Sequence, residues 1–92
     1  MIVSFNCSET ESLFRKGRTR LWSTIINVAE RKLAMLDAVS TLMDLRSPPG
    51  NRLELLEGNR KGQHSVRINN QWRVCFIWGP NGAENVEIVD YH

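Results

Sequence analysis

The chain has 92 residues, of which 41% are hydrophobic and 24% charged, and 12 Lys and Arg against 10 Asp and Glu give a net charge of +2. This composition is typical of a globular protein and excludes disordered, collagen-like and membrane-spanning chains. A chain this short builds one hydrophobic core, so a single domain is expected over residues 1–92. Two cysteines, Cys7 and Cys75, imply neither a disulfide framework nor a zinc site, so no metal or cofactor is expected. Because no signal segment is present, a cytoplasmic location is expected.

The first half of the chain predicts a short strand and two helices. A β-prone stretch at residues 2–5 precedes a capping box from Ser8 to Glu11, and Gly17 ends the first helix. A longer helix is expected to begin at Ser23, with Trp22 packing against its entry. Its apolar residues recur at helical spacing. They are Ile25, Ile26, Ala29, Leu33, Leu36 and Met43.

A second apolar line lies about 100° around the same helix. It consists of Val28, Met35, Val39 and Leu42. One facing sheet does not cover so wide a surface. Either the first helix covers this line, or a bound partner protein does.

After a break at residues 47–51, the hydrophobic period changes from helical to alternating. Strands are expected around Val66 and Ile68, from Trp72 to Trp78, and from Asn85 to Val89. Turns are predicted at Asn69 with Asn70 and at residues 79–82. The order is β-α-α-β-β-β, an α+β layer with helices on one face of an antiparallel meander and the other face open to a ligand.

The end of the chain, Asp90, Tyr91 and His92, combines a carboxylate, a phenol and an imidazole. It is either a solvated terminus or an acid–base site. Strand alternation sends Tyr91 to the face of Val89 and the other two residues to the opposite face.

Basic side chains supply candidate phosphate contacts. Arg73 projects from the face opposite Trp72 and Val74, and Arg67 shares that alternation on the preceding strand. A guanidinium on a rigid strand can hold a phosphate with two hydrogen bonds, whereas the alternative is a solvated strand arginine. Arg60 and Lys61 lie between glycines, in either a polar loop or an RNA-binding loop.

His64 and a basic run at residues 15–20 complete the candidates. His64 alternates with Val66 and Ile68, which favours a partly buried histidine, and it is kept as a candidate RNA contact. The basic run is more typical of a solvated turn between helices than of a binding patch.

Several of these motifs together resemble HigB-type toxins, in the plasmid-maintenance killer and GraT-like branch of the RelE/ParE superfamily. The resemblance spans essentially the whole chain. It is carried by the segments 48–53, 58–62 and 65–73, with the Trp72–Arg73 pair and the Asp90–Tyr91–His92 end as the most diagnostic pieces. It implies a compact RelE-like microbial ribonuclease fold.

The resemblance also implies a function. It is that of the toxin of a type II toxin–antitoxin system, a ribosome-dependent endonuclease that cuts mRNA in the ribosomal A site. A HigA-type helix-turn-helix antitoxin would neutralise it, operator DNA would be reached only through the toxin–antitoxin complex, and no membrane partner is implied. Arg73, Tyr91 and His92 match the active-site positions of the family.

One departure concerns the segment 53–57, where some relatives carry a histidine and a lysine and this chain has Glu54 and Glu57. Either Glu54 or His64 replaces that histidine, or the chemistry depends on the C-terminal residues.

The mechanism expected from the resemblance is metal-independent attack of a 2'-hydroxyl on the adjacent phosphate, which leaves a cyclic phosphate. His92 would be the general acid and Asp90 or Glu54 the base or orienting carboxylate. Arg73 would stabilise the phosphorane, Tyr91 would stack on a base or position the hydroxyl, and Arg60, Lys61 and Arg67 would anchor the backbone. The alternatives are a ParE-like poison of DNA gyrase and a degenerate toxin that acts as a co-repressor with its antitoxin.

Overall fold

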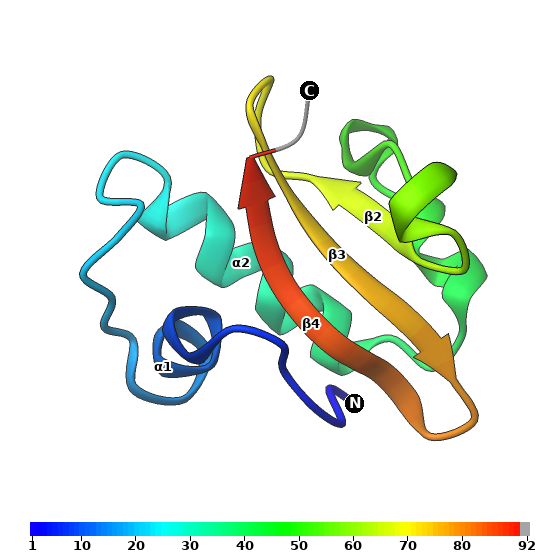
Figure 1. Cartoon of the computed structure of the whole chain (residues 1–92), viewed down its shortest axis with the longest axis horizontal. Coiled ribbons are helices and arrows are strands. Elements are labelled where there is room, and N and C mark those ends of the chain that lie inside the picture. The colour runs from blue at the N-terminus through cyan, green and yellow to red at the C-terminus, as the bar shows by residue number, and fades with distance from the viewer. Residues whose placement is uncertain (91–92) are drawn as a thin grey trace.

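The computed structural model describes residues 1–90 and confirms the α+β class (Figure 1). Two α-helices, α1 (Ser8–Lys16) and α2 (Ile26–Ala38), precede a four-stranded antiparallel sheet of order β1-β2-β3-β4. The strands are β1 (Glu54–Leu55), β2 (His64–Arg67), β3 (Trp72–Gly79) and β4 (Gly82–Asp90). No helix within residues 1–90 is long and apolar enough to cross a membrane.

The first helix ends as predicted but begins differently. Gly17 adopts the left-handed conformation, φ 68°, and its N–H donates to the Leu13 carbonyl. The predicted capping box is wrong, because Ser8 is already helical and the N-cap, Cys7, makes no side-chain cap bond. Glu11 instead accepts a hydrogen bond from Arg15 Nε, one helical turn on, at 2.8 Å.

The second helix is shorter than its apolar periodicity predicts. It begins after Ile25 rather than at Ser23 and ends at Ala38, because Val39 is extended and Thr41 caps a separate 3-10 helix, η1 (Leu42–Arg46). In that cap, Thr41 and Asp44 exchange hydrogen bonds between side chain and backbone. Met43 therefore leaves the core face of α2 and is 56% exposed.

The predicted N-terminal strand forms only two isolated parallel bridges to β4, Ile2 with Ala83 and Phe5 with Val86. Further along the same edge of β4, the Thr10 hydroxyl of α1 accepts a hydrogen bond from the Ile88 N–H at 3.1 Å. The N-terminal segment and α1 thus cover an edge that would otherwise expose unpaired backbone groups.

The core lies between α2 and one face of the sheet, which α2 crosses in Figure 1. Ala29, Leu33 and Leu36 pack there against strand residues such as Val74 and Phe76. The second apolar line of α2 is half-buried and packs against this core. Two of its members, Val39 and Leu42, lie beyond the end of α2 at Ala38. The choice between the first helix and a bound partner as its cover stays a prediction.

The break at residues 47–51 leads into a segment that wraps the outer edge of β2 (green in Figure 1). It contains two further 3-10 helices, η2 (Pro49–Asn51) and η3 (Gly58–Arg60), and the strand β1, which the sequence pattern did not predict. Asn51 is fully buried, and its Nδ2 donates to the carbonyls of Leu45 and Ser47. This buried amide fixes the start of the segment that borders the candidate site.

Candidate active site

The sheet face opposite the helices carries a row of four side chains. Glu54 pairs with Ser65, Ser65 with Cys75, and Cys75 with Glu87. Residues directly opposite each other in antiparallel strands project from the same face. In the next row, Arg67 pairs with Arg73, as their predicted alternation requires. The structure therefore brings Glu54, Arg67 and Arg73 to one face.

Arg73 is held at the centre of this face by three hydrogen bonds. Its Nε donates to Ser65 Oγ at 2.6 Å, and its Nη2 donates to the carbonyls of Arg52 at 2.7 Å and Ser65 at 3.4 Å. A guanidinium has five N–H groups. None of the described residues accepts a hydrogen bond from Nη1, so that nitrogen keeps two donors for an anion on a fixed base.

The face is less open than the sequence predicted. Ser65 and Cys75 have no exposed surface. Arg73 bonds to Ser65, and Cys75 pairs with Glu87 and lies within the electrostatic reach of Arg60 and Arg73. Burial raises the pKa of the Cys75 thiol, and the nearby charges act on it less strongly. A thiol in this state is a small buried side chain rather than a nucleophile.

Arg60 reaches the same face from η3 and pairs with an acid there. Its Nη1 donates to Glu87 Oε1 at 2.8 Å and to Gln63 Oε1 at 3.2 Å, and Glu87 Oε2 accepts from Asn6 Nδ2 at 2.6 Å. The Arg60 side chain is 31% exposed and that of Glu87 is 14% exposed. Part of the charge predicted for RNA binding is thus used to tie η3 to β4.

The other predicted RNA-binding residues on this side remain at the surface. Lys61 is exposed in the turn that follows η3, and Glu54 is exposed on β1. Arg67 is half-buried and donates through Nη2 to Asn70 Oδ1 in the turn between β2 and β3. Of these three residues, Arg67 pairs directly with Arg73, and Glu54 shares its sheet face through Ser65.

His64 lies on the opposite face of the sheet, where it pairs with Phe76. The two rings stack with centroids 6.2 Å apart. Burial lowers the pKa of His64, and its buried Nδ1 has no hydrogen-bond partner among the described residues. The structure thus separates His64 from Arg73. Of the two residues considered as replacements for the histidine of some relatives, Glu54 is the one that shares the face of Arg73.

Asp90 ends β4, pairs with Trp72, and accepts a hydrogen bond from Gln71 Nε2 at 3.0 Å. This pairing places Asp90 on the sheet face of Trp72 rather than on that of Arg73. The predicted Tyr91 and His92 lie outside the described residues.

Sequence reasoning missed Ser65, which holds Arg73; Glu87, which holds Arg60; and Asn51, which fixes the chain just before Arg52. The alternation of β4 was a usable signal for Glu87, since it stands between the core residues Val86 and Ile88. Nothing in the local sequence marks Ser65 or Asn51, because their roles depend on chain segments that meet only in the fold.

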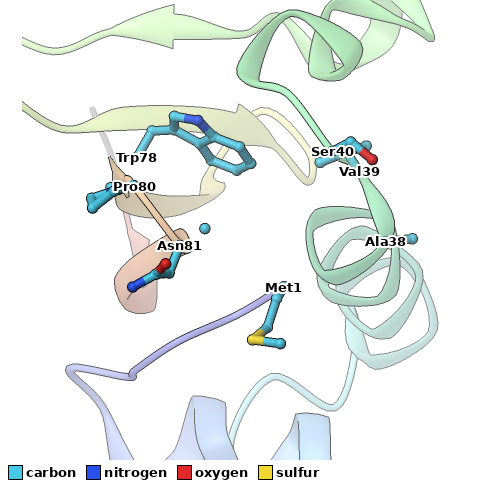
Figure 2. A pocket seen from close by; sticks show the side chains of 9 residues that line it. Met1, Ala38, Val39, Ser40, Trp78, Pro80 and Asn81 are labelled. Atoms are coloured by element: carbon cyan, nitrogen blue, oxygen red, sulfur yellow. The ribbon is translucent and has the colours of Figure 1, made fainter.

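A pocket of about 330 Å³ lies away from this face, between the end of α2, the N-terminus and the turn from β3 to β4 (Figure 2). Met1, Val39, Ser40 and Trp78 are among its lining residues. It contains none of the predicted site residues, so the candidate site is the charged sheet face and not this pocket.

The sequence matches a family model along nearly all of its length. Residues 4–92 match the model of the HigB-like toxin, described as the RelE-like toxin of the type II toxin–antitoxin system HigB. The chain belongs to the HigB-like toxin family.

Individual relatives agree with this family assignment. The chain is 55% identical over 63 residues to Toxin HigB-1 of Vibrio cholerae serotype O1, covering 68% of this chain and 66% of that protein. It is 38% identical over 68 residues to an uncharacterized protein of Haemophilus influenzae, covering 74% of this chain and 67% of that one. The matched segments thus span about two thirds of each relative.

The fold has a counterpart in a solved structure. The crystal structure of YafQ from E. coli strain BL21(DE3) superposes with a TM-score of 0.63 at 15% identity, covering 98% of this chain and 91% of that chain. At this identity the likeness concerns the fold alone. It supports the RelE-like fold that the sequence resemblance implied.

Proposed function

We propose that this HigB-like toxin is a metal-independent endoribonuclease that cuts translated mRNA in the ribosomal A site. The observation that carries the proposal is the fixed Arg73 guanidinium, whose Nη1 keeps two donors unused by the described residues. Arg67 and Glu54 lie on the same sheet face. Donors already oriented for a developing anion stabilise a transition state without reorganisation.

The proposed reaction is an intramolecular transesterification. A base removes the proton of the 2'-hydroxyl, the oxygen attacks the adjacent phosphorus, and the bond from phosphorus to the 5'-oxygen breaks. The leaving oxygen takes a proton, so the products are a cyclic phosphate and a 5'-hydroxyl. Arg73 would stabilise the charge on the pentavalent phosphorus, His92 would supply the proton, and Tyr91 would stack on a base or position the hydroxyl.

Two carboxylates are candidates for the base. Glu54 shares the sheet face of Arg73 through its pairing with Ser65, whereas Asp90 directly precedes Tyr91 and His92 and is held by Gln71. Glu54→Gln and Asp90→Asn distinguish them. Loss of the general base lowers the cleavage rate by about 10²–10⁴-fold, and loss of the other carboxylate lowers it less.

The experiment that tests the function compares one end-labelled mRNA on programmed ribosomes with the same mRNA free in solution. The proposal is supported if new RNA ends appear in the A-site codon only when the mRNA is on ribosomes, and if a folded His92→Ala variant produces none. Cleavage of both substrates would indicate a ribonuclease that needs no ribosome. Growth arrest without cleavage would favour the gyrase poison, and neither arrest nor cleavage would favour the degenerate co-repressor.

The partners and location follow from the same proposal. A HigA-type helix-turn-helix antitoxin would neutralise the toxin in the cytoplasm, and operator DNA would be reached only through their complex. The half-buried Val28 and Met35 of α2 offer such a partner apolar surface. Stronger hydrogen-exchange protection of α2 on antitoxin binding would support this interface, and unchanged protection of both helices would contradict it.

A further inference from the structure

Five cations lie on elements that meet around β2. This edge cluster consists of Arg31 and Lys32 on α2, Arg52 in the segment before β1, Arg67 on β2 and Arg73 on β3. The ion pairs between described residues join Arg15 to Glu11 and Arg60 to Glu87. Neither pair includes a member of the edge cluster.

A chain of hydrogen bonds connects the cluster from the helix to the candidate site. Lys32 Nζ donates to Asn51 Oδ1 at 2.6 Å, and Asn51 is buried with its amide bonded to the carbonyls of Leu45 and Ser47. The next residue, Arg52, offers its carbonyl to Arg73 Nη2 at 2.7 Å. Since Arg73 pairs directly with Arg67, the cations lie on one connected framework.

Within this cluster, the charges of Arg31 and Arg67 repel that of Lys32. The pKa of Lys32 is lowered, first by burial and then by the charges of Arg31 and Arg67. Like charges held together raise the free energy of the unbound protein, and a polyanion that binds them removes that repulsion. The arrangement is therefore favourable chiefly when an anion is bound.

We propose that the edge cluster binds the sugar–phosphate backbone of the RNA strand and leads it from Arg73, around the edge of β2, to α2. This inference rests on the proposed function and specifies the path of its substrate. Guanidinium groups suit phosphate oxygens, and cations spread along an edge match a chain with one charge per nucleotide.

An acidic protein segment fits this surface less well. The centre of a protein–protein interface is depleted of charged residues and contains apolar or aromatic anchors. The cluster consists of cations, and of the exposed large apolar residues only Leu55 lies on a strand that pairs with β2. The others are Met1, Val3, Leu21 and Met43. The observations therefore favour RNA.

The test measures binding of a single-stranded RNA in which every 2'-hydroxyl is methylated, so that it cannot be cut. Arg31→Gln and Arg31→Gln/Arg67→Gln are compared with Arg18→Gln, which removes the same charge from the exposed loop after α1, across the sheet from β2 (Figure 1). Arg31 is exposed, and its side chain makes no hydrogen bond or ion pair with the described residues. The single variant therefore still tests the inference if the double variant is unstable.

The expected result is a smaller salt dependence of binding. The slope of log K against log salt should fall by about 0.7 for each cluster cation removed, and affinity at low salt should fall about tenfold in the double variant. Arg18→Gln should match the wild type in both measures.

Three results would overturn the inference. The first is that both cluster variants keep the wild-type RNA affinity and salt slope. The second is that Arg18→Gln loses as much RNA affinity as the cluster variants. The third is that the cluster variants lose affinity for poly-glutamate while RNA binding is unchanged, which would assign the edge to an acidic protein. The proposed function fails separately, when the wild type leaves mRNA on ribosomes uncut.

Discussion

At the scale of single residues, Arg73 owes its orientation to Ser65. The hydroxyl and the carbonyl of this one buried serine accept two of the three hydrogen bonds of the guanidinium. A strand arginine without these hydrogen-bond acceptors would sample several rotamers in solvent. Ser65 is therefore a positioning residue whose effect on RNA passes through Arg73.

Replacing Ser65 by Ala should lower cleavage on ribosomes about tenfold, since one charge-assisted hydrogen bond to Arg73 is lost. Arg73→Ala should lower it about 10²–10³-fold, the effect of removing a transition-state donor. Single-turnover rates with saturating enzyme provide the measurement. Ser12→Ala, whose hydroxyl bonds to the Arg18 carbonyl at the surface, is the matched control and should cleave normally. Wild-type cleavage by folded Ser65→Ala would show that Arg73 needs no such support.

His64 makes the stability of the protein depend on pH. Burial lowers its folded-state pKa below the ordinary value of 6.5. As the pH falls through 6.5, the unfolded chain binds a proton before the folded chain does, so the free energy of unfolding decreases. The contribution is complete above the unfolded pKa and is lost as the pH falls through the folded pKa.

The melting temperature should therefore fall more steeply between about pH 7.5 and pH 5 in the wild type than in His64→Gln, which cannot titrate at this position. Thermal melts at matched ionic strength measure both proteins. All other titrating groups are shared by the two chains. A parallel decline would mean that His64 accepts its proton equally well in the folded protein.

At the scale of elements, the turn from β3 to β4 joins the N-terminus to the sheet. Gly82 has φ 133°, and its missing side chain leaves room for the Met1 carbonyl, which accepts a hydrogen bond from the Ala83 N–H at 2.9 Å. A Cβ at this position would collide with the Met1 carbonyl oxygen. Only glycine combines this backbone angle with this close approach.

Gly82→Ala should accordingly lower the free energy of unfolding by about 1–3 kcal/mol, through backbone strain and displacement of the N-terminal segment. Gly50→Ala is the matched control, because a Cβ there meets nothing within 4 Å, and it should change stability by less than about 0.5 kcal/mol. Urea unfolding measures both. Equal stability of the two variants would show that the N-terminus adds nothing to the sheet.

At the scale of the whole molecule, both faces of the central strand β3 are covered. Val74 and Phe76 face the core, and Cys75 on the other face also has no exposed surface. The charged face is therefore a second packed layer, formed by side chains from η3, β2, β3 and β4. Cys75 becomes accessible only when this layer opens.

In Cys7→Ser, which leaves Cys75 as the single thiol, reaction with an aromatic disulfide reagent should be slow in the native protein and fast in urea. Burial both blocks access to the thiol and raises its pKa. The labelling rate should follow the unfolding curve measured by circular dichroism. Rapid stoichiometric labelling under native conditions would show that the charged layer opens locally without unfolding.

The sequence by itself predicted the features that depend on local periodicity and turn chemistry. These are the α+β class, the left-handed end of α1 at Gly17, both turns of the meander and the projection of Arg73 away from the core. Each follows from spacing within one element. The family resemblance, which the comparisons confirm, added the expected chemistry.

The tertiary structure decided whatever depends on distant segments meeting. It reduced the N-terminal strand to two bridges on an edge shared with α1. The end of α2 at Ala38 is different, because the cap formed by Thr41 and Asp44 lies within one short stretch of sequence. The tertiary structure also paired Arg60 with Glu87 and brought the Arg52 carbonyl to Arg73. No window of sequence contains these pairings, because cross-strand register and the path of residues 46–62 are set by which surfaces can be buried together.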